Sequence, residues 1–132
     1  MPLIATDTPR LSHLVKHEYE SSMGFCREAV TGSNATATTW LVGTVLGKIT
    51  ATGKYIVAKE TAVDGSKVPA AVVIEEKTLA AATDTKVLTI VRGAVILSKG
   101  ALILDATYND ATKLAAAYAA LEAKNILINE TI

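Results

Sequence analysis

The chain is poor in the side chains that catalysis and covalent cross-linking most often use. It has one cysteine, Cys26, and two histidines, His13 and His17. A single cysteine excludes a disulfide within the chain, and we expect Cys26 to be a small, half-buried strand residue rather than a reactive thiol. A Ser-His-Asp or Cys-His arrangement would have to use one of the two histidines, which makes a hydrolase of that kind a poor fit.

A metal site is also poorly supported. His13 and His17 are four residues apart, so on a helix their imidazoles would share one face. Two ligands without a third are a weak signal, because protein metal sites usually supply three or four side chains. We therefore predict no catalytic residues, no metal and no cofactor.

An excess of charge of one sign is missing as well. The chain has 13 basic and 13 acidic residues, and no long basic run. Proteins that hold a phosphate backbone need clustered Lys and Arg, so we expect no direct nucleic-acid partner. Near-neutrality also removes one electrostatic barrier to self-association.

Long apolar runs are missing too. The longest, residues 114–121, is far short of the roughly 20 residues that cross a bilayer. The first ten residues, MPLIATDTPR, have no basic stretch followed by an apolar one, so we expect neither a signal peptide nor a membrane partner.

Three local patterns resemble chemical sites but lack the residues or the spacing that such sites require. Residues 43–50 contain Gly-x-x-x-Gly-Lys-Ile-Thr, but a phosphate-binding loop needs four residues between its glycines and a hydroxyl directly after the lysine. Lys48 is therefore predicted to be a solvated strand residue. Glu75 and Glu76 are adjacent and would point to opposite faces of a strand. Asp64-Gly65-Ser66 has the composition of a tight turn.

What is present is a chain of 132 residues, half of them hydrophobic, long enough for one domain with a modest core. Its pattern predicts a mainly β fold with one late helix. The strand patterns cover residues 25–30, 40–50, 54–58, 70–75, 86–97, 101–104 and 126–128. Gly43 and Gly47 predict a bulge or a close backbone approach, and Arg92-Gly93 a bulge or sharp bend.

The predicted helix covers residues 112–124, with Asn109 or Asp110 as its N-cap and Asn125 in the left-handed conformation at its end. Trp40 is predicted either to lie in the core or to contact a second subunit.

Residues 1–23 are predicted to form an arm that precedes a β-rich domain of residues 24–132. Leu11, Val15, Tyr19 and Met23 recur every four residues, which permits a short amphipathic helix capped by Ser12. The alternative is a frayed terminus with no role. The segment is more apolar than a disordered tail needs to be, so we expect a partner to cover it. The residues predicted to make that contact are Leu3, Ile4, Leu11, Leu14, Val15 and Tyr19.

The order of several short motifs resembles the lambda-type bacteriophage head decoration proteins. The motifs are Val45-Leu46-Gly47-Lys48, Gly53-Lys54-Tyr55, Asp64-Gly65-Ser66, Val91-Arg92-Gly93-Ala94 and Ala101-Leu102, followed by an Ala-rich helix and Leu-Glu-Ala-x-x-Ile-x-Ile at residues 121–128. Two positions depart from the family pattern: Ala71-Val72 replaces a Gly-Ile pair, and Asn125 replaces a glycine. The likeness runs from about Phe25 to the C-terminus.

The resemblance implies a β-clip-like (β-tulip) homotrimer without enzymatic activity. It implies binding to the major capsid protein on the outer surface of the expanded head, at three-fold and quasi-three-fold positions, and resistance to the pressure of packaged DNA. Such a protein is made in the host cytoplasm and ends in the virion. It also implies an arm that becomes ordered on the capsid, so deleting residues 1–20 is expected to abolish binding and leave the fold intact.

Two other functions stay open at this stage. One is a phage tail or adhesin module, which electron microscopy of virions would separate by position. The other is a trimeric nucleotide hydrolase of the β-clip architecture, for which Asp64-Gly65-Ser66 would have to supply the carboxylate and the phosphate-binding cluster.

Overall fold

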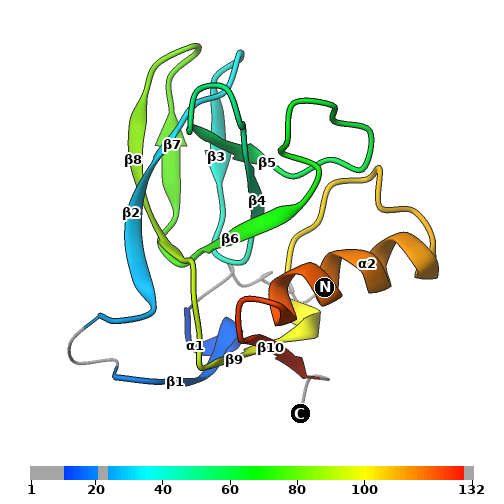
Figure 1. Cartoon of the computed structure of the whole chain (residues 1–132). Coiled ribbons are helices and arrows are strands. Elements are labelled where there is room, and N and C mark those ends of the chain that lie inside the picture. The colour runs from blue at the N-terminus through cyan, green and yellow to red at the C-terminus, as the bar shows by residue number, and fades with distance from the viewer. Residues whose placement is uncertain (1–10, 21–23, 130–132) are drawn as a thin grey trace, which may run out of the picture.

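The structure, a computed structural model, describes residues 11–20 and 24–129 (Figure 1). Five strands close into a barrel in the order β2-β5-β4-β6-β8. They are β2 (Arg27–Gly32), β4 (Val45–Lys48), β5 (Tyr55–Val57), β6 (Pro69–Val73) and β8 (Thr85–Ile90). Two further strands, β3 (Thr38–Trp40) and β7 (Lys77–Leu79), pair with each other as an antiparallel ribbon.

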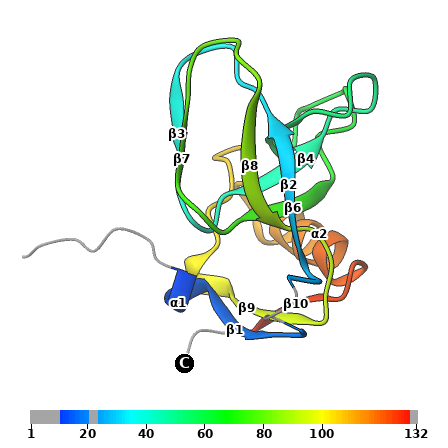
Figure 2. The same cartoon turned by 90° about the vertical axis from the view of Figure 1, so that its left-hand side faces the viewer.

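A second sheet lies below the barrel in both Figure 1 and Figure 2, and we call it the lower sheet. Its order is β1-β9-β10, where β1 is Val15–Glu18, β9 is Val95–Ser98 and β10 is Ile126–Asn129. A single turn of helix, α1 (Leu11–Leu14), precedes β1, and a 3₁₀ turn, η1 (Lys99–Ala101), follows β9. The long helix α2 (Ala111–Glu122) runs beside the barrel and leads into β10. The predicted class, mainly β with one C-terminal helix, is confirmed.

Two predicted strands are each divided in the structure. Residues 40–50 were expected to form one strand region, but β3 and β4 belong to different sheets. Residues 86–97 likewise divide into β8 of the barrel and β9 of the lower sheet. The predicted interruption at Arg92-Gly93 is where the chain leaves the barrel, so the sharp bend is confirmed and the continuous strand is wrong.

The glycines at 43 and 47 sit where predicted, at close backbone approaches. Gly43 has a φ of +101°, and a Cβ there would meet the carbonyl oxygen of Ala101. A Cβ on Gly47 would meet the carbonyl of Ser66, and the β4–β6 register shifts between Leu46 and Gly47. Both the close approach and the bulge are therefore confirmed.

The N-terminal end of α2 follows the prediction, whereas its C-terminal end comes two residues earlier than predicted. The side chain of Asp110 accepts a hydrogen bond from the backbone N–H of Lys113 at 2.8 Å, which is N-cap geometry. Asn125 has a φ of +63°, so its predicted left-handed conformation is confirmed, but α2 ends at Glu122 with Ala123 as its C-cap, so Asn125 is not the cap that was predicted. The strand expected at residues 101–104 is wrong, because η1 covers Ala101 and only one isolated bridge, Thr44 to Ile103, follows.

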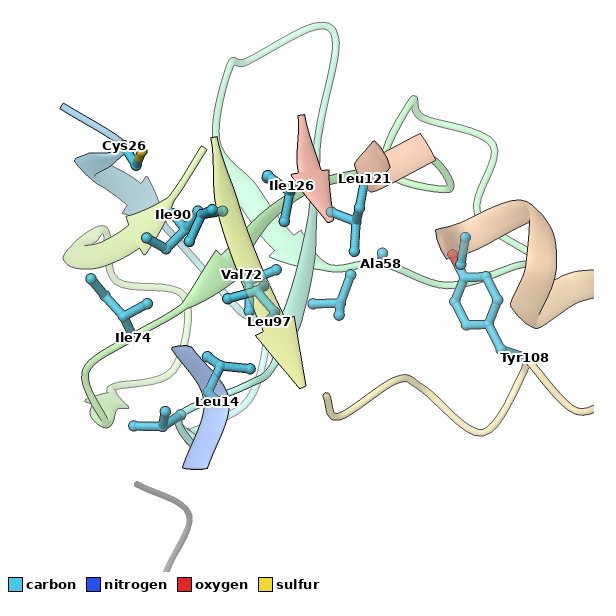
Figure 3. Close-up of a cluster of buried hydrophobic side chains, with 14 residues drawn as sticks. Leu14, Cys26, Ala58, Val72, Ile74, Ile90, Leu97, Tyr108, Leu121 and Ile126 are labelled. Atoms are coloured by element: carbon cyan, nitrogen blue, oxygen red, sulfur yellow. The ribbon is translucent and has the colours of Figure 1, made fainter. Parts of the chain in front are cut away.

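Two clusters of buried side chains hold these layers together. One, the upper cluster, fills the barrel and the β3–β7 ribbon, and includes Trp40, Leu46 and Leu79. The other, the lower cluster, joins the barrel to the lower sheet and α2, with Val72 and Ile90 from the barrel meeting Leu97 of β9 (Figure 3). The lower sheet is therefore attached to the barrel through a shared core.

Candidate interaction surfaces

The residues predicted to bind a partner divide between two places. Leu3 and Ile4 lie outside the described residues. Leu11 and Val15 are half-buried and pack against the lower cluster, whereas Leu14 is fully buried within it (Figure 3). The predicted amphipathic helix through residue 23 is wrong, since α1 ends at Leu14 and the chain continues as β1. Ser12 lies inside α1 and cannot be its N-cap.

Strand β1 is fixed to the rest of the molecule by its ladder with β9. The two strands are antiparallel, and the register slips by one residue between Val15 and His17. His17 lies on this strand and is exposed, so it shares no helix face with His13. Among the residues that the structure describes, no group of three His, Cys, Asp or Glu side chains could hold a metal ion.

A two-pronged ion pair fastens the end of β1 to the barrel. The guanidinium of Arg27 donates from Nε and from an Nη to the two oxygens of Glu18, both at 2.8 Å. The Glu18 side chain is only 4% exposed, so this pair is largely withdrawn from water. Bidentate, desolvated Arg–carboxylate pairs are the geometrically specific kind. Sequence reasoning missed this contact, because nothing in the spacing of residues 18 and 27 marks it.

An aromatic cluster lies beside this ion pair. The rings of Tyr19 and Phe25 meet edge to face with centroids 5.7 Å apart. The Arg92 guanidinium lies 5.8 Å from the centroid of the Phe25 ring and donates to the Phe25 carbonyl oxygen at 2.7 Å. Tyr19 and Phe25 are each about half exposed. Their contacts tie Tyr19 and Phe25 to the bend that follows β8.

Cys26 lies under this cluster and is completely buried. The residue stands directly before β2 rather than within it, and it is more buried than predicted. Its thiol faces the carbonyl oxygens of Tyr19 and Ala94 at 3.5 and 3.8 Å. Burial, and then the negative charge of Glu18, raise the pKa of Cys26, so the thiol stays protonated and unreactive at neutral pH.

The structure places Trp40 in the core of this subunit, where 2% of its surface is exposed. Its ring packs against Gly32, where a Cβ would collide with it. The prediction that Trp40 lies in the core is therefore confirmed for the single chain. A contact with a second copy stays a prediction, with little of the ring left on the surface to make it.

The Asp64-Gly65-Ser66 segment is a hydrogen-bonded turn. Gly65 has a φ of +99°, and the Asp64 carboxylate accepts both the backbone N–H and the hydroxyl of Ser66. These hydrogen bonds lower the pKa of Asp64. Ser66 is buried and its hydroxyl is occupied by its own turn, so the geometry does not present a nucleophile or a phosphate cradle.

One surface hollow beside β3 is also unsuited to acid–base chemistry. It has a volume of about 320 Å³ and lies between β3 and residues 103–106. Asp105 is the ionisable residue lining it, and its carboxylate accepts hydrogen bonds from the backbone and hydroxyl of Thr107. A lone carboxylate engaged in its own turn cannot act as half of an acid/base pair.

A second, apolar groove lies where α2 meets the loop after β5. It has a volume of about 100 Å³ and is lined by Val68, Pro69, Tyr108 and three alanines of α2, with the ion pair of Glu60 and Lys67 at its side. The hydroxyl of Tyr108 donates to the Lys67 carbonyl at 2.7 Å and fixes this loop. Val63 and Val68 on the same loop are strongly exposed, so apolar side chains are displayed here.

These features define a protein built on a closed five-stranded β-barrel with an attached three-stranded sheet. No described helix is long and apolar enough to cross a membrane.

The comparisons with known proteins carry this further. The family model of the bacteriophage lambda head decoration protein D matches residues 4–126, nearly the whole chain, so the chain belongs to that family. A search of the curated proteins gives no match. The members of this family are structural, non-enzymatic proteins that decorate and stabilise the phage head, which places their role at the capsid surface of the virion.

Proposed function

We propose that this protein binds as a homotrimer to the major capsid protein on the outside of the expanded head, at three-fold and quasi-three-fold positions. There it bridges neighbouring capsid subunits and resists the outward pressure of packaged DNA. The match of the family model over residues 4–126 carries this proposal.

We assign the capsid-binding arm to residues 1–10, which is shorter than the 1–23 expected from sequence. Leu14 is fully buried and Glu18 is paired with Arg27, so residues 11–20 serve better as the anchor of the arm than as its binding part. Leu3 and Ile4 then become the apolar contacts that meet the capsid.

The energetics favour binding by three arms together. Ordering a residue costs about 1–2 kcal/mol in backbone entropy. A buried Leu or Ile side chain returns about 1.5–3 kcal/mol, so two such anchors offset only part of the cost of ten residues. Main-chain hydrogen bonds from strand addition contribute more. Linking three arms adds about 10²–10⁴ in avidity, which limits strong binding to lattices that present three matched sites.

Removal of residues 1–10 tests the arm. We expect the truncated protein to lose at least 100-fold in affinity for expanded capsids in a sedimentation assay, with an unchanged thermal midpoint. Deletion of residues 1–20 is no longer a clean test, because it removes Leu14 and β1 from the fold.

Two matched proteins sharpen the experiment. Replacing Leu3 and Ile4 by Ser keeps the length of the arm and should weaken binding almost as much, whereas removing residues 130–132 should leave it intact. Full binding by the protein that lacks residues 1–10 would exclude the arm mechanism. Failure of the intact protein to bind either expanded or unexpanded capsids would overturn the proposed function.

A further inference from the structure

The turn at Asp64 is the one place in the sequence where an aspartate precedes a glycine. None of the other four aspartates is followed by glycine, and neither is any asparagine. The backbone nitrogen after an aspartate can attack the carboxyl carbon of its side chain and close a five-membered succinimide ring. A side chain on the second residue obstructs that nitrogen, so Asp-Gly is the aspartyl pair most open to this reaction. Asp64 and Gly65 are both exposed to solvent.

The fold requires the glycine of this pair. Gly65 has a φ of +99°, in the region that residues with a side chain rarely adopt. A Cβ on Gly65 would also collide with the hydroxyl oxygen of Thr50. The turn therefore keeps the vulnerable pair for structural reasons, and any protection of Asp64 has to come from other residues.

Ser66 makes two contacts that oppose the ring closure. Its backbone N–H donates to Oδ1 of Asp64 at 3.1 Å, and its hydroxyl donates to the same oxygen. Ring closure expels one carboxyl oxygen as water, so the carboxylate must first take up a proton. Hydrogen bonds to the charged form favour that form, and they also restrain rotation of the carboxyl group. Ser66 is 2% exposed, so it is held in place by its surroundings.

We propose that Asp64-Gly65 is a site of spontaneous backbone modification in this protein, and that the Ser66 hydroxyl sets its rate. The Gly65 nitrogen forms a bond to Cγ of Asp64 and loses its hydrogen, and the carboxyl oxygen leaves as water. A second water molecule then opens the ring at either carbonyl. Opening at the main-chain carbonyl leaves the peptide bond on Cγ, which is isoaspartate, and opening at Cγ restores aspartate.

The turn is too tightly held to accept the isoaspartyl product unchanged. Isoaspartate places one more carbon atom in the main chain between residues 64 and 65. The chain is held on both sides of that point: the N–H of Thr50 donates to the Asp64 carbonyl at 2.9 Å, and Ser66 closely approaches Gly47. The isoaspartyl form is therefore expected to lose one of these contacts and to have a lower thermal midpoint.

Ageing of the purified full-length protein at pH 6 and 37 °C tests this proposal. Peptide mapping with enzymatic methylation of isoaspartate should find the product at residue 64 and not at Asp84 or Asp110. Ser66→Ala, checked by its thermal midpoint to be folded, should form isoaspartate at least fivefold faster than the wild type. Thr61→Ala, at an exposed residue of the same loop, is the matched control and should age like the wild type. Equal rates in the wild type and in Ser66→Ala would overturn the role of Ser66.

Two further measurements do not depend on the stability of Ser66→Ala. Wild-type protein unfolded in urea lacks the hydrogen bonds of the turn and should age at least fivefold faster than the folded protein. Asp64→Asn closes the same ring with loss of ammonia, so a change in intact mass follows the reaction in the folded state. Equal rates in folded and unfolded wild type would overturn the protection. An unchanged mass of folded Asp64→Asn, while the unfolded variant reacts, would overturn the site itself.

Discussion

The barrel and the lower sheet solve the problem of strand edges in opposite ways. The five barrel strands close on themselves, so each has a neighbour on both sides. The three strands of the lower sheet stay open, and the two ends of the described chain meet there in β1 and β10. Closure leaves no strand of the barrel at an edge, whereas β1 and β10 each pair on one side alone among the described strands.

The two parts nevertheless share a core. Val72 and Ile90 of the barrel lie in the same cluster as Leu14, Leu97 and Ile126 of the lower layer (Figure 3). A displacement of side chains in the lower sheet would therefore change the packing of the barrel directly. Four changes would break or sharpen the contrast between a closed and an open part.

The largest effect is expected from Leu46→Ala in the barrel. Leu46 is fully buried in the upper cluster, and removing such a side chain costs about 2–5 kcal/mol of unfolding free energy. Urea denaturation followed by circular dichroism gives the value. Leu127→Ala, at a residue 42% exposed, is the control and should cost less than 1 kcal/mol. Equal losses in the two variants would contradict the assignment of the core.

Leu14→Ala applies the same substitution to the lower layer. Leu14 is as buried as Leu46, but it belongs to a short N-terminal segment that we expect to open while the barrel stays folded. The loss of unfolding free energy should therefore not exceed about 2 kcal/mol, the lower end of the usual cost of such a cavity. Once the segment opens locally, the cavity no longer destabilises the rest of the fold. Native-state hydrogen exchange should show faster exchange in β1 and unchanged exchange in β4. A loss equal to that of Leu46→Ala would show that the segment and the barrel unfold as one.

Glu18→Gln tests the ion pair that fastens β1. The change leaves Arg27 without its carboxylate, and we expect a loss of about 1.4 kcal/mol, or tenfold in local opening. Cys26 reports it, because its thiol is buried beneath Tyr19. Labelling by a thiol reagent at pH 8 should be slow in the wild type and about tenfold faster in the variant. Glu75→Gln, at an exposed carboxylate just before β7, is the control, and equal rates in all three proteins would contradict the fastening role.

The smallest effect concerns the turn at Asp64. Its pKa is lowered by the hydroxyl and backbone N–H of Ser66, so the native state favours the charged carboxylate. The sign follows: this contribution is complete above the ordinary pKa of 3.8 and is lost as pH falls through the lowered value. Thermal midpoints from pH 6 to pH 2 should fall slightly less steeply for Asp64→Asn than for the wild type. Identical profiles would mean that the turn does not depend on the charge.

Local rules predicted much of this fold. Asp110 was found as the N-cap of α2, and Asn125 as a left-handed residue after it, because both features depend on residue type and local position. Gly43 and Gly47 were found because a glycine inside a strand pattern marks a close approach. The turn at Asp64 and Gly65 followed for the same reason.

Long-range partners were beyond sequence reasoning. The pairing of β3 with β7 joins Thr39 to Thr78, and a short polar strand such as β7 carries no apolar alternation to mark it. The four-residue spacing of Leu11, Val15 and Tyr19 predicted a helix. Val15–Glu18 instead forms a strand, because it pairs with β9, which the local spacing could not indicate. Of the interaction surfaces, the apolar character of the N-terminus was predicted from the sequence. The order of the strands in the lower sheet was not, because it depends on pairing between distant segments.

The Glu18–Arg27 pair has a mechanical consequence. Under the proposed role, swelling of the head pulls on residues 1–10, and the tension enters the fold at Leu11. Two routes then carry it in parallel: the β1–β9 ladder and the paired guanidinium of Arg27 at the start of β2. Tension shared in this way reaches the closed barrel, which has no edge strand to peel. Under the proposed role, the N-terminal segment therefore transmits the load from the capsid to the closed barrel.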